Sequence, residues 1–172
     1  MKRYLITFLL ILFAALSRLL PHPPNFVPIT AMALFGGMCL ERKHAFIVPL
    51  AAMAISDYFI GFSTDFLWVY GSFIAIGFIG LWLRSHRGVL QTIGASVTGS
   101  ILFFAVTNFG VWVSSQLEYP HTLTGLVTCY VAAIPFFRNT LLGDLIYVGV
   151  MFGLFEMARK FLLSPQPGKS EA

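Results

Sequence analysis

Apolar runs long enough to cross a membrane follow one another along this chain, separated by short polar or proline-containing turns. A helix needs roughly 20 predominantly apolar residues to span the hydrocarbon of a bilayer. Charged residues make up only 10% of the 172 residues, which is too few to cover the surface of a water-soluble domain. The sequence therefore predicts an all-α polytopic membrane protein, with a single transmembrane domain over residues 1–163.

Six of the apolar runs are predicted to be transmembrane helices. Prolines and charged turns set their ends, as in "PHPP" after the first run, "ERKH" after the second and "RSHRG" after the fourth. The predicted spans are residues 4–20, 26–40, 45–62, 66–83, 89–113 and 139–163. The polar residues 164–172 are expected to form a disordered cytoplasmic tail.

Another apolar segment, residues 122–137, precedes the last predicted span. Its apolar part is about 15 residues long, which is short for a transmembrane helix. Pro120 and Pro135 bracket it, and proline inside a helix removes a backbone hydrogen bond. We therefore expect a short re-entrant or interfacial helix here.

The distribution of basic residues gives the predicted orientation. With six spans and a cytoplasmic N-terminus, nine of the eleven Lys and Arg residues lie on the cytoplasmic side: Lys2, Arg3, Arg42, Lys43, Arg84, Arg87, Arg159, Lys160 and Lys169. Only Arg18 and Arg138 lie on the outer side, whereas a seventh span would leave six inside and five outside. The positive-inside rule thus favours six spans with both termini in the cytoplasm, as in a bacterial inner membrane protein. The net charge of +4 is explained by this orientation and not by nucleic-acid binding.

The first apolar run has a second interpretation, because "MKR" precedes it and Ala15-Leu16-Ser17 resembles a cleavage site. A cleaved signal peptide would leave five spans and the same charge bias. Apolar residues continue past this site to Leu20, which favours a retained helix.

Asp57 is the most informative polar residue, because an aspartate within a transmembrane helix costs about 2.5–3.5 kcal/mol on insertion scales. Such a cost is usually offset by a partner, and Arg18 and Arg138 lie at the same predicted level. One interpretation is a structural charge pair, with Asn139 capping the last helix. The other is a polar cavity, open to the outside, whose charged groups orient a small molecule.

The polar residues outside the cytoplasmic loops gather at this outer level. The candidate substrate-binding residues are Arg18, His22, Asn25, Asp57, Asn108, His121, Thr124, Tyr130, Arg138, Asn139 and Asp144. Arg138 and the positive end of the last helix are expected to favour a ligand with an anionic group. Gly36 and Gly37 are expected to allow close helix packing.

Familiar catalytic chemistry is not encoded. The sequence has no Walker motif, no G-x-S-x-G and no H-E-x-x-H. His22 and His121 share the outer side, but no matching third ligand is evident, so no metal site is expected. We therefore predict neither catalytic residues nor a cofactor.

Two stretches carry a resemblance to a known class of transporter. In "PITAMALFGGMCLERKHAFIVPLAAMAISDYFIGF" a glycine-rich helix is followed by one that ends with Asp57 and a Gly-aromatic pair. In "YVAAIPFFRNTLLGDLIYVGVMFGLFEMARKFL" a Pro-Phe-polar turn leads into the last helix. Both are similar to the substrate-binding S components of energy-coupling-factor (ECF) vitamin transporters. "RLLPHPPNFVPITAMALFGG" and "YPHTLTGLVTCYVAAIPFFRNTLLGDLIY" more closely resemble an uncharacterised family of proposed transport proteins related to S components.

The resemblance implies a six-helix, S-component-like protein that takes up a vitamin-like small molecule from an outward-facing pocket. It also implies docking onto an ECF-type coupling protein that carries ATPases. Docking in that class uses alanines four residues apart in the first helix, whereas residues 4–13 here read "YLITFLLILF". A transporter that works alone is therefore an alternative. The rival functions are a membrane-embedded enzyme acting on a lipid or isoprenoid at the outer leaflet and a non-catalytic subunit of a membrane complex.

Overall fold

The computed structural model describes residues 2–114 and 119–162, and over these residues the chain is all-helical, with six helices and no strand. The predicted disordered tail, residues 164–172, lies outside the described residues. The helices are α1 (Lys2–Ser17), α2 (Ile29–Cys39), α3 (His44–Ile60), α4 (Phe66–Leu83), α5 (Val89–Val113) and α6 (Leu123–Leu162).

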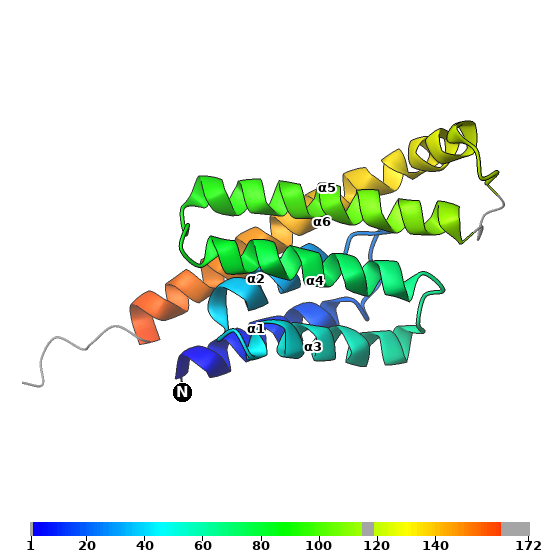
Figure 1. The fold of residues 1–172 in the computed structure, drawn as a ribbon. Coiled ribbons are helices and arrows are strands. Elements are labelled where there is room, and N and C mark those ends of the chain that lie inside the picture. The colour runs from blue at the N-terminus through cyan, green and yellow to red at the C-terminus, as the bar shows by residue number, and fades with distance from the viewer. Residues whose placement is uncertain (1, 115–118, 163–172) are drawn as a thin grey trace, which may run out of the picture.

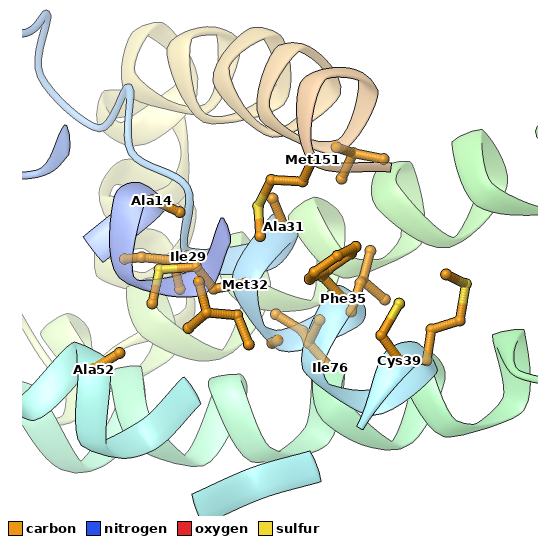
Figure 2. Packing of buried hydrophobic residues seen from close by; sticks show 14 of the residues in the cluster. Ala14, Ile29, Ala31, Met32, Phe35, Cys39, Ala52, Ile76 and Met151 are labelled. Carbon is orange, nitrogen blue, oxygen red and sulfur yellow. The ribbon is translucent and has the colours of Figure 1, made fainter. Parts of the chain in front are cut away.

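Five of the helices form a closed ring, and α2 lies at its centre. In the ring each helix contacts its neighbours in the order α1, α3, α4, α5, α6 and back to α1. The central helix α2 contacts all five, and every one of its 11 residues is buried. Figure 2 shows α2 residues such as Met32 and Phe35 at the centre of the apolar core, with Ala52, Ile76 and Met151 contributed by ring helices.

The helices run alternately in opposite directions, so the turns gather at two ends of the bundle (Figure 1). We call the end that carries residues 18–28 and 61–65 the cavity end. The opposite end carries the turns at residues 40–43 and 84–88 and the C-terminal end of α6. We call it the basic end, because Arg42, Lys43, Arg84, Arg87, Arg159 and Lys160 lie there.

Glycines bring the backbones of α2 and α4 into contact. A Cβ atom added at Gly37 would lie 2.5 Å from the carbonyl oxygen of Gly77 and 2.8 Å from the Cα atom of Gly80. A Cβ atom at Gly36 would lie 2.2 Å from the Pro49 side chain. The prediction that Gly36 and Gly37 allow close helix packing is confirmed, and this contact fixes α2 against the ring.

In the part of the chain that the structure describes, three helices are long and apolar enough to cross a membrane: α4, α5 and α6 over Leu123–Phe161. They are consistent with a membrane protein, and large apolar side chains such as Phe78, Ile101 and Val131 are exposed on them. The apolar helices at Tyr4–Ser17, Ile29–Cys39 and His44–Ile60 are shorter. The prediction of six transmembrane spans is therefore not confirmed, although the described residues form six helices.

The separate re-entrant helix expected at residues 122–137 is not observed. Residues Leu123–Leu162 form one continuous 40-residue helix that includes Pro135. Proline costs a helix one backbone hydrogen bond and a steric clash with the preceding turn. Long apolar helices tolerate that loss through local adjustment, and the prediction gave Pro135 too much weight. At 1.5 Å per residue α6 is about 60 Å long, twice the thickness of a bilayer's hydrocarbon.

Candidate functional site

A cavity of about 360 Å³ lies at the N-terminal end of α2. It exists because α2, at 11 residues, rises only about 16 Å, whereas the ring helices continue past it toward the cavity end. We call it the central cavity. Its polar lining residues are Arg18, His22, Asn25, Thr30, Asp57, Ser63, Asp65, Tyr70, Thr107, Asn108, Thr140 and Asp144.

A buried charge pair forms one wall of the cavity. Arg18 Nη2 lies 2.6 Å from Asp57 Oδ1, and both side chains are only 10% exposed. The Tyr70 hydroxyl donates to the other carboxylate oxygen, Asp57 Oδ2, at 2.8 Å. The Asp57 carboxylate, on α3, is thus held by Arg18, the residue after α1, and by Tyr70 of α4. Of the two expected partners of Asp57, Arg18 is confirmed.

Arg18 also ties the end of α1 to the backbone of α3. Its Nη1 group donates to the hydroxyl of Ser56, which in turn donates to the carbonyl oxygen of Met53 at 2.8 Å. The third guanidinium nitrogen, Nε, is buried without a hydrogen-bond partner. Arg18 therefore fixes the geometry of the wall and keeps one unpaired donor.

Asp144, from α6, lies at the floor of the cavity and is fully buried. Ser100 Oγ donates to its Oδ2 atom at 2.6 Å. The carboxyl also faces the backbone N–H groups of Thr30 and Ala31, the first turn of α2. Pro28, at the N-cap of α2, supplies no side-chain hydrogen bond to that helix. Asp144 therefore takes the place of a capping residue, because a carboxylate is favourable at the positive end of a helix.

The Thr30 hydroxyl lies at this floor beside the Asp144 carboxyl. The Thr30 side chain and the N–H groups of Thr30 and Ala31 face that carboxyl, and both Thr30 Oγ1 and Asp144 Oδ1 are buried. Buried polar atoms are nearly always paired. Asp144 and the first turn of α2 therefore stabilise one another at the floor of the cavity.

Two threonine hydroxyl groups of the wall donate their protons within their own helices. Thr107 donates to Phe103 O at 2.8 Å, and Thr140 donates to Phe136 O at 3.2 Å. A hydroxyl that donates to the preceding turn still has free lone pairs. This part of the cavity therefore presents hydrogen-bond acceptors.

The structure brings six of the eleven predicted site residues to the central cavity. These are Arg18, His22, Asn25, Asp57, Asn108 and Asp144. They come from the 18–28 turn, α3, α5 and α6. The remaining five, His121, Thr124, Tyr130, Arg138 and Asn139, do not line it.

Arg138 and Asn139 do not have their expected roles. Both lie in the interior of α6, which begins at Leu123, so Asn139 caps no helix. Its Nδ2 group donates to Pro24 O at 3.0 Å and ties α6 to the 18–28 turn. Arg138 is exposed. The positive helix end that was expected to attract an anionic ligand is therefore not present at this position.

His121 and Tyr130 belong to the contact between α5 and the start of α6. The Tyr130 hydroxyl donates to Ala105 O at 2.5 Å. The His121 ring lies 5.5 Å from the Trp112 ring, measured between centroids. Thr124 is exposed, and its carbonyl accepts a hydrogen bond from Thr128. His121 and Tyr130 thus hold the hairpin of α5 and α6 together, and all three residues lie outside the cavity.

Tyr70 and Asp65 are the main cavity residues that sequence reasoning missed. Tyr70 lies just over one turn into α4, and Asp65 immediately precedes that helix. The sequence did contain a signal for both residues. Only a short turn separates α3 from α4, so the start of α4 lies at the level of Asp57. The apolar "FLWVY" around Tyr70 concealed it.

The described residues hold no group of three or more His, Cys, Asp or Glu side chains that could bind a metal ion. His22 lines the cavity and His121 does not, so the two histidines do not share a site.

Comparison with known proteins identifies a family without assigning a function. The model of a family of unknown function (DUF6580) matches residues 1–166, nearly the whole chain. Neither the curated proteins nor the solved structures give a match. The comparisons show no link to ECF S components, so that resemblance stays a prediction. The chain belongs to the family of unknown function DUF6580.

Proposed function

We propose that this protein is a membrane-embedded, substrate-binding transport protein that takes up a vitamin-like small molecule through the central cavity. The observation that carries the proposal is the cavity itself, a polar space at the end of a short, fully buried helix inside a ring of apolar helices. Small-molecule sites in proteins are typically concave, largely apolar spaces of about 300–1,000 Å³ with a few placed polar groups.

The cavity suits binding better than free passage. Beyond its floor, α2 fills the ring, and the contact of Gly37 with Gly77 and Gly80 leaves no space between α2 and α4. A molecule in the cavity therefore reaches the other side only if helices move relative to one another. This favours a carrier-like or S-component-like protein over a channel.

The proposed orientation places the cavity end outside a bacterial inner membrane and both termini in the cytoplasm. It is supported by the six basic residues at the basic end, because cytoplasmic turns are rich in Lys and Arg. The sequence has no nucleotide-binding motif, so energy for uptake would come from a partner such as an ECF-type coupling protein with ATPases, or the protein would act alone.

Depletion of solutes from the medium would test this function. Cells that express the wild-type protein should remove at least one small molecule faster than cells that express Asp57→Asn at equal membrane levels, as measured by untargeted mass spectrometry of the medium. Copurification of ATPase subunits would separate a coupled transporter from one that acts alone. Equal depletion by both strains, with altered lipids in the wild-type strain, would instead support the enzyme alternative.

A further inference from the structure

A groove and a pocket meet at the basic end of the bundle, away from the central cavity. The groove has a volume of about 320 Å³ and is lined by Tyr4, Phe8, Leu40, Glu41, His44 and Val48. We call it the apolar groove. The pocket has a volume of about 190 Å³ and includes Arg84 and Arg87, so we call it the arginine pocket. It shares Tyr4, Leu40 and Glu41 with the groove, and the two spaces are therefore continuous.

The apolar groove runs lengthwise between α1 and α3, which contact each other in the ring. Tyr4 and Phe8 lie about one turn apart on α1. His44 and Val48 have the same spacing on α3, and both helices run away from the basic end (Figure 1). The groove therefore leads from the basic end toward the middle of the bundle. Farther along α3 the outer surface stays apolar, with Ile55 exposed, so an acyl chain can lie along it.

The turns beside the arginine pocket carry positive charge. Residues 40–43 and 84–88 contain four basic residues and one acid, Glu41, which gives a formal charge of +3 with histidine neutral. The pocket itself is lined by two arginines and Glu41, so it is also positive. Basic side chains next to an apolar membrane-facing surface attract anionic lipid headgroups.

The two arginines of the pocket are held in place by the backbone. Arg84 Nη2 donates to Gly37 O at 2.7 Å and to Leu40 O, and Arg87 Nε donates to Arg84 O at 2.9 Å. A guanidinium group has five N–H donors, so these bonds leave the two terminal nitrogens of Arg87 for a ligand. Arg87 is exposed, and terminal guanidinium nitrogens match phosphate oxygens with two parallel hydrogen bonds.

We propose that the arginine pocket and the apolar groove together bind one anionic phospholipid. Its phosphate lies at Arg87 and Arg84, and one acyl chain follows the groove past Phe8 and Val48. The groove alone would accept any hydrocarbon, and the arginines alone would accept any phosphate. Because the two spaces are continuous, they fit a molecule that carries both groups. The site is separate from the central cavity and does not depend on the transport proposal, since it requires only that this surface faces a bilayer.

Three probes distinguish the lipid from its parts. Dioleoylphosphatidylglycerol is anionic, dioleoylphosphatidylcholine has the same chains and no net charge, and glycerol 3-phosphate has the phosphate without the chains. Native mass spectrometry of the full-length protein in detergent counts the molecules bound during titration with each probe. The anionic lipid should bind about fivefold more tightly than the zwitterionic lipid, or better. Glycerol 3-phosphate should not bind at the same concentrations.

Two results would overturn the proposal. Equal binding of the two lipids would show that the arginines do not select the headgroup. Binding of glycerol 3-phosphate as tight as that of the anionic lipid would show a site for a free phosphate group, to which the groove contributes nothing.

Arg87 provides the test of the headgroup contact. Arg87→Gln should weaken binding of the anionic lipid by about fivefold, since one basic residue near a lipid surface contributes about that much. Arg87→Lys keeps the charge and should retain part of the affinity, because lysine lacks the two-pronged geometry. Arg159→Gln is the matched control, since Arg159 lies at the same end in an exposed pair with Glu156 and does not line the pocket. Wild-type affinity in Arg87→Gln, or an equal loss in Arg159→Gln, would contradict the assignment.

Two further variants test the sign of the charge effect and the path of the chain. Glu41→Gln removes the acid beside the pocket and should strengthen binding of the anionic lipid by about threefold. Weaker binding in this variant would contradict a phosphate group at this position. Val48→Phe narrows the groove and should weaken binding of both lipids to a similar extent. Unchanged binding of both lipids in Val48→Phe would show that the chain does not lie in the groove, and the proposal would be wrong.

Discussion

Asp144 and Arg84 occupy opposite ends of the central helix α2. The Asp144 carboxyl faces the N–H groups of its first turn, and Arg84 Nη2 lies 2.7 Å from Gly37 O near its last turn, with Leu40 O as a second acceptor. An acid at the N-terminus and a base at the C-terminus both stabilise the helix dipole. Each helix end leaves backbone groups unsatisfied, and every residue of α2 is buried, so these groups need partners within the protein. These two side chains therefore explain how an 11-residue helix is stable there.

Removal of the group at the C-terminal end should destabilise the fold. Arg84→Gln loses charge-assisted hydrogen bonds to buried carbonyls, and we expect the free energy of unfolding to fall by about 1.5–3 kcal/mol. Arg159→Gln, which removes an exposed pair with Glu156 at 2.6 Å, should cost no more than about 1 kcal/mol. Denaturation in mild detergent measures both. A cost for Arg84→Gln no larger than for the control would show that α2 does not depend on this contact.

The buried pair should show strong coupling. Arg18→Gln and Asp57→Asn each leave one buried charge without its partner, and we expect each to cost about 3–5 kcal/mol. The double variant should cost much less than the sum, because neither charge remains. A double-mutant cycle on the free energy of unfolding measures the coupling. Additive effects would mean that the 2.6 Å contact contributes little.

The glycine contact between α2 and α4 predicts a position-specific effect of a single methyl group. Gly37→Ala places a Cβ atom 2.5 Å from Gly77 O and should destabilise the protein by about 1–3 kcal/mol. Gly149→Ala in α6 meets no atom within 4 Å and should be neutral, or stabilising by up to about 1 kcal/mol. Thermal unfolding of the two variants gives the comparison. Equal unfolding temperatures would contradict the close approach.

The proposed orientation predicts which ends react with an impermeant thiol reagent. In a background without Cys39 and Cys129, Arg87→Cys should react only from the cytoplasmic side and Thr124→Cys only from the outside. Both positions are exposed at their ends of the bundle. Labelling of intact cells and of inverted vesicles checks this. The opposite pattern would reverse the orientation and place the cavity end in the cytoplasm.

The helices that are flanked by clear turn signals could be predicted from the sequence. The predicted ends of residues 66–83 and 89–113 coincide with those of α4 and α5, because charged or glycine-containing turns flank them. The error in α6 came from Pro135, for which a helix break was expected. Whether a proline breaks an apolar helix depends on what surrounds it, and the surroundings are not visible in the sequence.

The site could be predicted where a single charged residue interrupts an apolar run of the sequence. Asp57 in an apolar helix required a cation, and Arg18 was one of two at its level. The role of Asp144 was not predictable, because it caps a helix more than 100 residues earlier in the chain. The shortness of α2, which creates the cavity, was also hidden, since residues 26–40 read as one apolar run.

The most direct test of the central claim is mass spectrometry of small molecules extracted from the purified protein. Wild-type protein should release a molecule in near-stoichiometric amount, and Thr107→Trp, which fills the central cavity from α5, should release much less. Ile101→Trp is the matched control on the same helix, because Ile101 is 51% exposed on the outer surface and does not line the cavity. It should retain the wild-type amount. An equal amount from the wild-type protein and the Thr107→Trp variant, or no molecule from any of them, would contradict a ligand site in the central cavity.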